Sequence, residues 1–471
     1  MAAQSHITFD RLDPISERVA TRAASAGPED ALEAANAAAA AFPAWSATTP
    51  ADRAGILTEA AALLEARADA FVAAMAEEIG SSERWARFNC QLAGEMLRQA
   101  ATLCGYETRI AVDGGRDDIA SYQLRQPVGV VLGIAPWNAP VVLGTRAVAA
   151  PLACGNTTVL KASELCPKTH SLIVESLNDA GLPPGAVNLV THAPEHAGEI
   201  VEALVGHDAV RRVNFTGSTR VGRTVAEICA RHLKPCLLEL SGKAPLLVLA
   251  DADVEAAVEA AAFGAFFNQG QICISTERLV VDAAVADDFV AAFARKAASL
   301  HAGDPRTGDF PLGSMIGMPA VRRIKGLIDD AVAKGATLVT GGTFDNTIMQ
   351  PTVLDHVHSG MRVYHEESFG PVAAVIRVAG EAEAISVANN TEYGLAAAVF
   401  SRDVARAERV ARQLETGICH INGPTLYDDP RMPFGGMKAS GYGRFGGEAG
   451  VHEFTELRWM SIQQGPRDYP I

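Results

Sequence analysis

From Pro127 onward, short apolar runs alternate with stretches of helical periodicity, and this alternation limits the possible folds more than any other feature of the sequence. The apolar runs cover residues 128–135, 157–161, 186–191, 210–215 and 236–240. The helical patterns between them cover residues 141–153, 167–180, 194–204 and 218–232. Strands that alternate with helices at this spacing form βαβ units around a parallel sheet. The sequence therefore predicts an α/β fold.

A second series of the same kind follows. Its helical patterns lie near residues 253–267, 283–299, 318–334, 381–388 and 403–414. Its strand patterns lie near residues 244–249, 278–282, 372–378, 396–400 and 418–421. We expect two α/β layers with a cleft between them.

The remaining segments read differently. Residues 29–77 have helical periodicity, with interruptions expected at Pro43 and Pro50, and another helix pattern covers 81–105. Within 107–127, two alternating runs flank Gly114-Gly115, which predicts a β-hairpin arm. The tail 452–471 is again strand-like.

Charge and composition exclude several classes of protein. A chain of 471 residues exceeds one ordinary core, and its net charge of −15 argues against nucleic acid and anionic membranes as partners. The longest apolar stretch, 129–153, contains Pro136 and Arg146, so we expect no membrane span. No signal peptide is evident. The eight cysteines show no metal-ligand spacing, and we expect reduced thiols in the cytoplasm and no bound metal.

Cys273 ends the polar segment that starts at Phe267, between the helix pattern 254–266 and the strand pattern at 278–281. A thiol at such a connection can face a cavity. We interpret Cys273 as a catalytic nucleophile whose surroundings lower its pKa, although most cysteines are merely packed.

The segment 214–222 ends a strand and opens a helix. Gly217 allows close backbone approach, and Ser218 can cap the helix, so its N-terminus can hold a phosphate. An ordinary capped helix is the alternative. Lys161 and Glu164 close an earlier strand, where a carboxylate and a lysine can bind a ribose. Taken alone, that pair is better explained as a solvated turn, but beside the segment 214–222 we favour ribose binding.

Three further side chains are candidates for chemistry. Asn138 lies in a turn fixed by two prolines, so its amide can stabilise an oxyanion, or it can simply hold the turn. Glu239 lies in an apolar strand, where desolvation would raise its pKa toward that of a general base. A buried salt bridge, for instance to Lys243 or a nearby arginine, is the alternative. Glu367 and Phe369 precede another strand, and we expect them either at the nicotinamide end of a dinucleotide or in a plain turn.

The motifs IAPWNAP, KASE, FTGSTRVG, LELSGK, NQGQIC, EESFGPV and PFGGMKASGYGR follow one another across about three quarters of the chain. The spacing from Glu239 to Cys273 is 273 − 239 = 34 residues. This ordered set resembles the NAD(P)-dependent aldehyde dehydrogenase superfamily. The wider sequence is most similar to the bacterial aromatic aldehyde dehydrogenases of the salicylaldehyde, vanillin and benzaldehyde type.

The resemblance implies roles for individual residues. Cys273 would be the nucleophile, Glu239 the general base and Asn138 an oxyanion donor. The cofactor, NAD rather than NADP, would contact Trp137, Lys161, Ser163, Glu164, Gly217, Ser218, Gly222, Leu240, Glu367 and Phe369. The small-molecule aldehyde would contact Arg146, Leu143, Phe267, Tyr427 and Phe434.

The resemblance also implies an organisation. Residues 1–106 and 128–238 would form a Rossmann-type cofactor domain and residues 239–451 the catalytic domain. Residues 107–127 and 452–471 would form the oligomerisation element of a homodimer or homotetramer.

This chain departs from the family at one position after Asn138. Many members have a lysine nine residues after that asparagine, where this chain has Ala147, preceded by Arg146. Arg146 either pairs with a polar substituent of the substrate ring or forms a structural ion pair. An aliphatic aldehyde or semialdehyde remains an alternative substrate. A cysteine esterase or hydrolase and a non-catalytic binding protein are alternatives of other classes.

Overall fold

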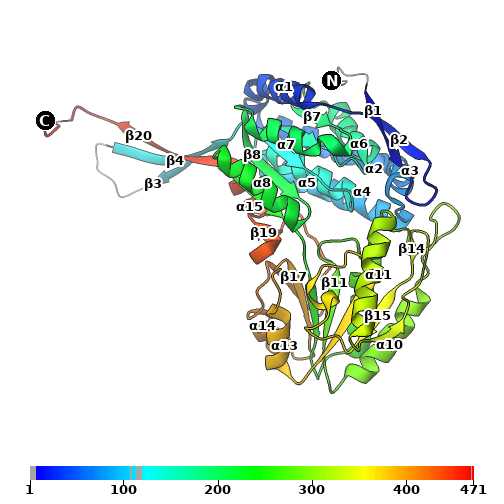
Figure 1. Cartoon of the computed structure of the whole chain (residues 1–471). Coiled ribbons are helices and arrows are strands. Elements are labelled where there is room, and N and C mark those ends of the chain that lie inside the picture. The colour runs from blue at the N-terminus through cyan, green and yellow to red at the C-terminus, as the bar shows by residue number, and fades with distance from the viewer. Residues whose placement is uncertain (1–6, 107–108, 113–118, 468) are drawn as a thin grey trace.

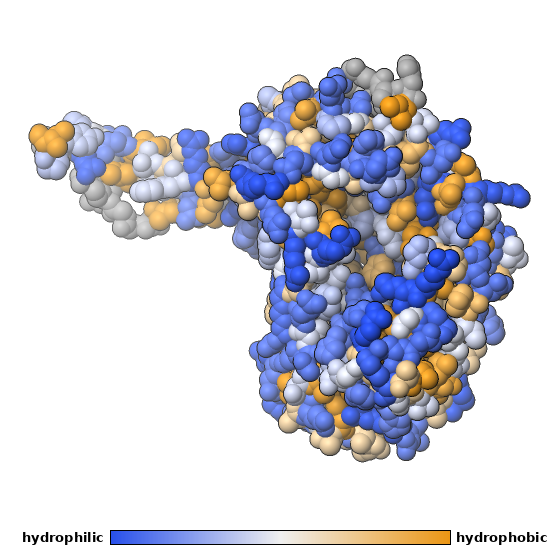
Figure 2. All heavy atoms as spheres, viewed as in Figure 1, coloured by the Kyte–Doolittle hydropathy of each residue, from blue (hydrophilic) through white to orange (hydrophobic). Residues whose placement is uncertain are grey.

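The computed structural model describes residues 7–106, 109–112, 119–467 and 469–471. Two sheets flanked by helices lie one above the other, and a narrow antiparallel arm projects from the upper one (Figure 1). The space-filling view in Figure 2 shows a hollow between the two halves. The predicted α/β class is confirmed.

The first sheet has six strands in the order β19-β9-β8-β5-β6-β7. The parallel strands are β5 (Val130–Ile134), β6 (Thr157–Lys161), β7 (Val187–Val190), β8 (Val210–Thr216) and β9 (Cys236–Glu239). The helices between them are α5 (Pro140–Ala153), α6 (Pro167–Asp179), α7 (Ala197–Gly206) and α8 (Thr219–Arg231). The chain runs outward from β5 through β7 and then returns to β8 on the other side of β5. This reversal creates a crevice beyond the ends of β5 and β8.

The second sheet has seven strands in the order β12-β15-β16-β11-β10-β17-β18. The predicted strands appear as β10 (Ala244–Val248), β11 (Thr276–Asp282), β16 (Val372–Val378), β17 (Ala396–Phe400) and β18 (Ile418–Ile421). The predicted helices appear as α9 (Val254–Phe266), α10 (Ala286–Ser299), α11 (Met318–Ala333), α13 (Glu381–Asn389) and α14 (Val404–Ala411). Elements that we did not predict here are β12 (Thr337–Thr340), β13 (Phe344–Asp345), β14 (Ile348–Met349), β15 (Thr352–Asp355) and α12 (Arg362–His365).

The N-terminal segment begins with an unpredicted hairpin, β1 (Thr8–Leu12) and β2 (Val19–Ala24). The helices that follow are α1 (Pro28–Ser46), α2 (Pro50–Ala66), α3 (Ala68–Ile79) and α4 (Glu83–Leu103). The expected interruption at Pro43 is wrong, because Pro43 lies inside α1. Pro43 is exposed, so water can satisfy the carbonyl group that loses its helical partner.

The arm is a three-stranded antiparallel sheet of β3 (Arg109–Val112), β4 (Ile119–Pro127) and β20 (Thr455–Gln463). The predicted turn at Gly114-Gly115 lies outside the described residues. The arm carries exposed apolar side chains, including Trp459 at 78% exposure, and Figure 2 shows orange atoms along it.

The predicted domain limits stay a prediction. Between the second sheet and the arm, β19 (Gly441–Tyr442) pairs with β9 of the first sheet. The next helix, α15 (Gly447–Glu453), contacts α4 and α5. β19 and the first five residues of α15, 447–451, fall within the range 239–451 that we assigned to the other domain.

No helix in the described ranges is both long enough and apolar enough to span a bilayer. The central strands of both sheets are buried on both faces, which explains their nearly continuous apolar sequences.

Aromatic stacking fixes α9, the helix that leads to Cys273. The ring of Phe293 on α10 stacks against Phe266 at 5.6 Å and Phe289 at 5.7 Å between centroids. All three side chains are fully buried. Since Phe266 is the last residue of α9, this stack holds the end of that helix.

Phe293→Ala should lower the free energy of unfolding by about 3–5 kcal/mol, because it leaves a cavity under α9. Phe344→Ala is the control, since Phe344 is 40% exposed and the change should be below about 0.5 kcal/mol. Equilibrium urea unfolding measures both. A loss below about 1 kcal/mol for Phe293→Ala would contradict the packing argument.

Candidate active site

A cavity of about 280 Å³ lies at the crevice between the two sheets. Its lining comes from segments that are far apart in the sequence, namely Pro136, Trp137, Asn138, Thr216, Gly217, Ser218, Glu239, Ser241, Cys273, Arg323, Glu367 and Phe369. The three predicted catalytic residues are therefore in one cavity with five of the predicted cofactor residues.

Cys273 follows an unusual backbone turn. Helix α9 ends at Phe266, and the 3-10 turn Phe267–Gly270 contains Asn268, Gln269 and Gly270 with φ values of 48°, 56° and 69°. Left-handed conformations cost a non-glycine residue about 1–3 kcal/mol. A Cβ atom on Gly270 would lie 2.2 Å from the carbonyl oxygen of Gly370, so glycine is required there. The turn directs the chain from the buried helix back toward the cavity.

Hydrogen bonds tie Asn138 to this turn. Asn138 Nδ2 donates to the Gln271 carbonyl oxygen at 3.0 Å. The Asn138 carbonyl oxygen accepts from Asn268 Nδ2 and from Trp85 Nε1, each at 3.0 Å. The side-chain amide is thus held two residues from Cys273 in a fixed orientation, as an oxyanion donor requires.

Glu239 is the last residue of β9 and is fully buried. Its two carboxylate oxygens have no hydrogen-bond partner among the described residues. Burial raises the pKa of Glu239 to about 7, while the Cys273 thiol and the Arg146 charge oppose the rise. The alternative of an ion pair with Lys243 is not what the structure has, because Lys243 pairs with Glu277. A carboxylate with this pKa can exchange protons near neutrality.

The expectation of a lowered pKa for Cys273 is wrong. Burial raises the pKa of the Cys273 thiol well above its usual value, and the neighbouring Glu239 carboxylate raises it further. Arg146 is the nearby cation that opposes this effect. The physical reason is that a thiolate here would be a second negative charge in a desolvated site.

The N-terminus of α8 forms a cradle that fits a phosphate group. Ser218 caps the helix by accepting from Val221 N at 3.4 Å. A Cβ atom on Gly217 would lie 2.5 Å from the Phe215 ring, and one on Gly222 would lie 2.4 Å from Leu240. Glycine at both positions lets this end of the helix pack closely against Phe215 and Leu240.

Lys161 is the last residue of β6 and pairs with Ile134, the last residue of β5. It therefore lies at the same edge of the first sheet as the N-terminus of α8. Burial lowers the pKa of Lys161, and the charge of Glu164 opposes this effect, so the two side chains are near each other. Ser163 Oγ accepts from Leu165 N at 3.2 Å. Helix N-terminus, lysine and carboxylate lie on one side of the crevice, and this donor set fits a dinucleotide.

Glu367 and Phe369 border the same cavity from the second sheet. Glu367 Oε1 accepts from Gly242 N at 2.9 Å, and burial raises the pKa of Glu367 to about 7. The Phe369 ring meets Trp137 edge-on at 5.8 Å between centroids. The 367–369 loop and the 137–138 turn therefore face each other across the cavity.

The predicted substrate residues lie outside this cavity. Arg146 forms a buried ion pair with Asp428, and its guanidinium lies 4.2 Å from the centroid of the Phe434 ring. The structure thus contains the ion pair that was one of the two alternatives for Arg146. Leu143 is buried on α5. A role of either residue toward a substrate stays a prediction.

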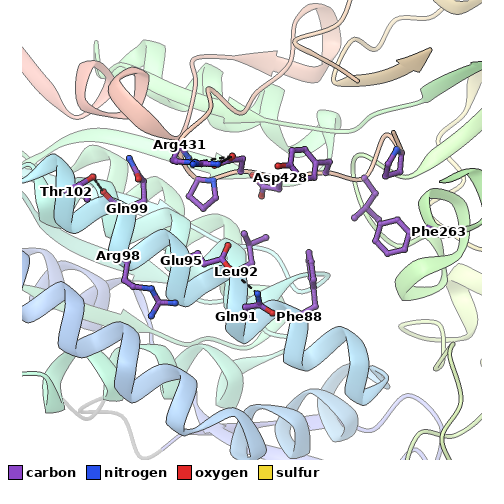
Figure 3. Close-up of a pocket in the computed structure, with 15 residues that line it drawn as sticks. Phe88, Gln91, Leu92, Glu95, Arg98, Gln99, Thr102, Phe263, Asp428 and Arg431 are labelled. Carbon is purple, nitrogen blue, oxygen red and sulfur yellow. Dashed lines mark hydrogen bonds and ion pairs between the residues drawn. The ribbon is translucent and has the colours of Figure 1, made fainter. Parts of the chain in front are cut away.

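A second cavity, of about 580 Å³, lies near Phe267 and Tyr427. Figure 3 shows side chains of α4, among them Phe88 and Leu92, facing a loop that carries Asp428, with Phe263 at one end. Tyr427 also lines this cavity. The Phe267 ring lies 5.8 Å from Phe88 and 5.1 Å from Phe263, so it connects the cavity wall to the Cys273 turn.

Sequence reasoning missed several residues of the site. Thr216 and Ser241 directly adjoin predicted positions, and their hydroxyl groups were a usable signal. Arg323 lies on a face of α11 whose pattern is that of an ordinary surface helix, and no local signal identifies it. Trp85 was hidden for the same reason in α4.

Comparison with known proteins gives a consistent picture. The sequence pattern of the aldehyde dehydrogenase family matches residues 1–460. A vanillin dehydrogenase of Pseudomonas fluorescens is 57% identical over 98% of this chain and 96% of its own length. A benzaldehyde dehydrogenase [NAD(+)] of Pseudomonas putida is 38% identical over 98% of this chain and 94% of its own length. The crystal structure of a salicylaldehyde dehydrogenase from Pseudomonas putida G7 with salicylaldehyde superposes with a TM-score of 0.98, at 47% identity, over 100% of this chain and 98% of that one.

Alkylation of Cys273 by iodoacetamide should keep accelerating into alkaline pH without a plateau near neutrality, because its pKa is raised. Glu239→Gln removes the neighbouring charge and should move the profile to lower pH. Mass spectrometry of the Cys273 peptide measures the rate. Cys236 is an internal reference, since Cys229 and Tyr442 lower its pKa to about 7. A Cys273 profile unchanged by Glu239→Gln would show that the carboxylate does not control the thiol.

Proposed function

This chain belongs to the aldehyde dehydrogenase family, and we propose that it oxidises an aromatic aldehyde to the carboxylic acid with NAD, using Cys273, Glu239 and Asn138. The observation that carries the proposal is the single cavity in which these three side chains meet the cradle of α8. A cysteine hydrolase would need the nucleophile, the base and the oxyanion donor, but not the cradle.

The first step is addition of the Cys273 thiol to the aldehyde carbonyl. The thiol must lose its proton, and Glu239, with its pKa of about 7, is the neighbouring base. The product is a tetrahedral thiohemiacetal on the cysteine sulfur. Asn138 Nδ2 and the Cys273 backbone N–H stabilise its oxyanion, and one such donor is worth about 3–4 kcal/mol.

The second step converts the thiohemiacetal to a thioester. When bound, NAD supplies the hydride acceptor. We propose that Gly217 and Ser218 hold its pyrophosphate, and that Lys161 and Glu164 hold the adenosine ribose. The contacts carried over for the other cofactor residues are Trp137, Ser163, Gly222, Leu240, Glu367 and Phe369.

In the last step, Glu239, having released the thiol proton to solvent, takes a proton from water; the hydroxide adds to the thioester carbonyl, the C–S bond breaks, the acid leaves and the Cys273 sulfur takes back a proton. Glu239 must be deprotonated for this, so the rate should fall as pH drops below about 7. The carboxylate has two oxygens without partners among the described residues, and these are free to accept from a water molecule.

An aromatic substrate is supported by the relatives and by the second cavity. The vanillin, salicylaldehyde and benzaldehyde dehydrogenases all act on benzaldehyde-type compounds by their names. We propose that the aldehyde approaches Cys273 past the Phe88 and Phe263 rings (Figure 3) and the Phe267 ring that contacts both. Arg146, whose charge reaches the site, would act on a polar ring substituent.

NAD is preferred over NADP in this proposal, because the Glu164 carboxylate would accept from a free ribose hydroxyl and repel a phosphate in its place. The family as a whole uses both cofactors.

A homodimer or homotetramer is supported by the arm, whose exposed apolar side chains, such as Leu457 and Trp459, need a partner surface. Sedimentation equilibrium measures the mass, and a monomer would refute this assembly. Location in the cytoplasm is supported by the eight free thiols.

Mixing the protein with NAD or NADP and a panel of aldehydes should produce reduced cofactor fastest with NAD and aromatic aldehydes. Cys273→Ala should lower turnover by at least about a thousandfold and leave NAD binding intact. Arg146→Ala should lower the rate of oxidation of hydroxylated benzaldehydes more than that of benzaldehyde itself. Absorbance of the reduced nicotinamide follows all three. Ester cleavage without any aldehyde oxidation would indicate the hydrolase instead, and faster turnover of aliphatic semialdehydes would reject the aromatic substrate.

Gln91→Trp should raise KM for aromatic aldehydes by roughly tenfold, the lower end of what a misfit in an apolar pocket costs. Gln91 is an exposed residue on α4 that lines the cavity of Figure 3. KM for NAD should not change, because the cofactor cavity has other walls. Gln413→Trp, at an exposed site elsewhere, is the control. Equal KM values for the two variants would place the substrate path away from this cavity.

A further inference from the structure

A buried ion pair joins the two segments that carry Glu239 and Cys273. Lys243 Nζ bonds the Glu277 carboxylate, and their side chains are 0% and 3% exposed. Lys243 lies four residues after Glu239, and Glu277 lies four residues after Cys273. The parallel pairing of β10 with β11 sets the two residues next to each other. The pair is not part of the cavity lining, so it does not touch a ligand there.

The free side of the Glu277 carboxylate holds the loop that borders the cavity. Its oxygens accept from Ser368 N at 2.8 and 3.0 Å and from Phe369 N at 3.1 Å. Glu277 is thus satisfied on one side by a lysine and on the other by two backbone N–H groups. This arrangement offsets the cost of burying both charges.

The same loop is held at other points. Gly242 N, next to Lys243, donates to Glu367 Oε1 at 2.9 Å. Arg323 donates to the carbonyl oxygens of Glu367 at 2.9 Å and Ser368 at 2.5 Å. The 367–369 loop is therefore held by the segment after β9, by Arg323 of α11 and by Glu277 of β11.

Phe369 has φ of +44°, a conformation that a bulky residue adopts only when its surroundings impose it. Its N–H group bonds Glu277, and its ring meets Trp137 edge-on in the cavity. The bond to Glu277 is thus the contact that fixes the strained residue at its backbone, while the ring is the part that faces the cavity.

We propose that the Lys243–Glu277 pair positions the 367–369 loop for the nicotinamide half of the cofactor. Both residues are positioning residues, and they act through Ser368 and Phe369. The inference rests on the proposed function, because that function makes this loop a cofactor wall. It assigns the pair to cofactor binding and not to the chemistry of Cys273.

Two variants of the full-length protein test the proposal. Lys243→Met with Glu277→Leu removes both charges of the pair and both carboxylate acceptors at similar volume. Glu277→Asp keeps the charge and shortens the carboxylate, which is the milder change. Lys296→Met with Glu259→Leu, an exposed Lys–Glu pair between α9 and α10, is the control.

Two measurements separate positioning from general damage. Calorimetry gives the dissociation constant of NAD, and hydrolysis of p-nitrophenyl acetate without NAD reports Cys273 and Glu239. The double variant should weaken NAD binding by roughly tenfold, and Glu277→Asp by roughly threefold, with ester hydrolysis within about twofold of the parent. The control should change neither.

Each outcome has a distinct meaning. NAD affinity unchanged in Glu277→Asp and in the folded double variant would overturn the proposal, as would equal losses in NAD affinity and ester hydrolysis. If the double variant does not fold, Glu277→Asp decides alone. A parent protein that hydrolyses the ester but does not bind NAD would instead refute the proposed function.

Discussion

The left-handed turn before Cys273 is the constraint on which the site depends. A helix that ran on past Phe266 would carry the thiol into the apolar core between α9 and the second sheet. Instead, Asn268, Gln269 and Gly270 all adopt positive φ, and the chain reverses toward the crevice. Backbone strain of this kind persists only where the surroundings impose it. Here the Asn268 amide bonds the Asn138 carbonyl oxygen, so the strained turn from one sheet is locked to the oxyanion donor of the other. The geometry of the proposed nucleophile and of the proposed oxyanion donor is therefore one unit.

Burial then sets the electrostatics of that unit. Desolvation raises the pKa of both Glu239 and Cys273; the Glu239 charge raises the pKa of the thiol further, whereas the Cys273 thiol lowers the pKa of Glu239. The pair therefore favours a state with at most one negative charge, which makes proton transfer from thiol to carboxylate local and reversible. A free thiolate at rest would be exposed to oxidation and alkylation. A thiol that is deprotonated only when an electrophile is beside it avoids both oxidation and alkylation. It then depends on a base, Glu239, whose own pKa lies near 7.

Much of the fold could be predicted because its strands and helices have local signals. The parallel strands are buried on both faces and read as apolar runs, and each helix between them has a periodic apolar face. Pro43 misled the prediction because a proline at an exposed helix position is tolerated. The catalytic residues were accessible through motifs at strand ends. Their electrostatics were not, since the pKa of Cys273 depends on burial, and the Arg146 partner, Asp428, is 428 − 146 = 282 residues away in the sequence. Arg323 reaches the site only through the packing of α11.

The departure at Ala147 has a structural reason. A Cβ atom on Gly133 of β5 would lie 2.9 Å from the Ala147 Cβ, so α5 packs against the sheet too closely for a longer side chain to lie between them. The preceding residue, Arg146, is held instead by Asp428 and the Phe434 ring. Its charge is the cation that lowers the pKa of both Glu239 and Cys273. Asp428 acts on Glu239 with the opposite sign and raises its pKa. The net effect on the pKa of Glu239 therefore depends on the balance between the Arg146 and Asp428 charges. A substrate group that drew Arg146 away from Asp428 would thus change the proton affinity of Glu239, which would couple a ring substituent to the proposed general base.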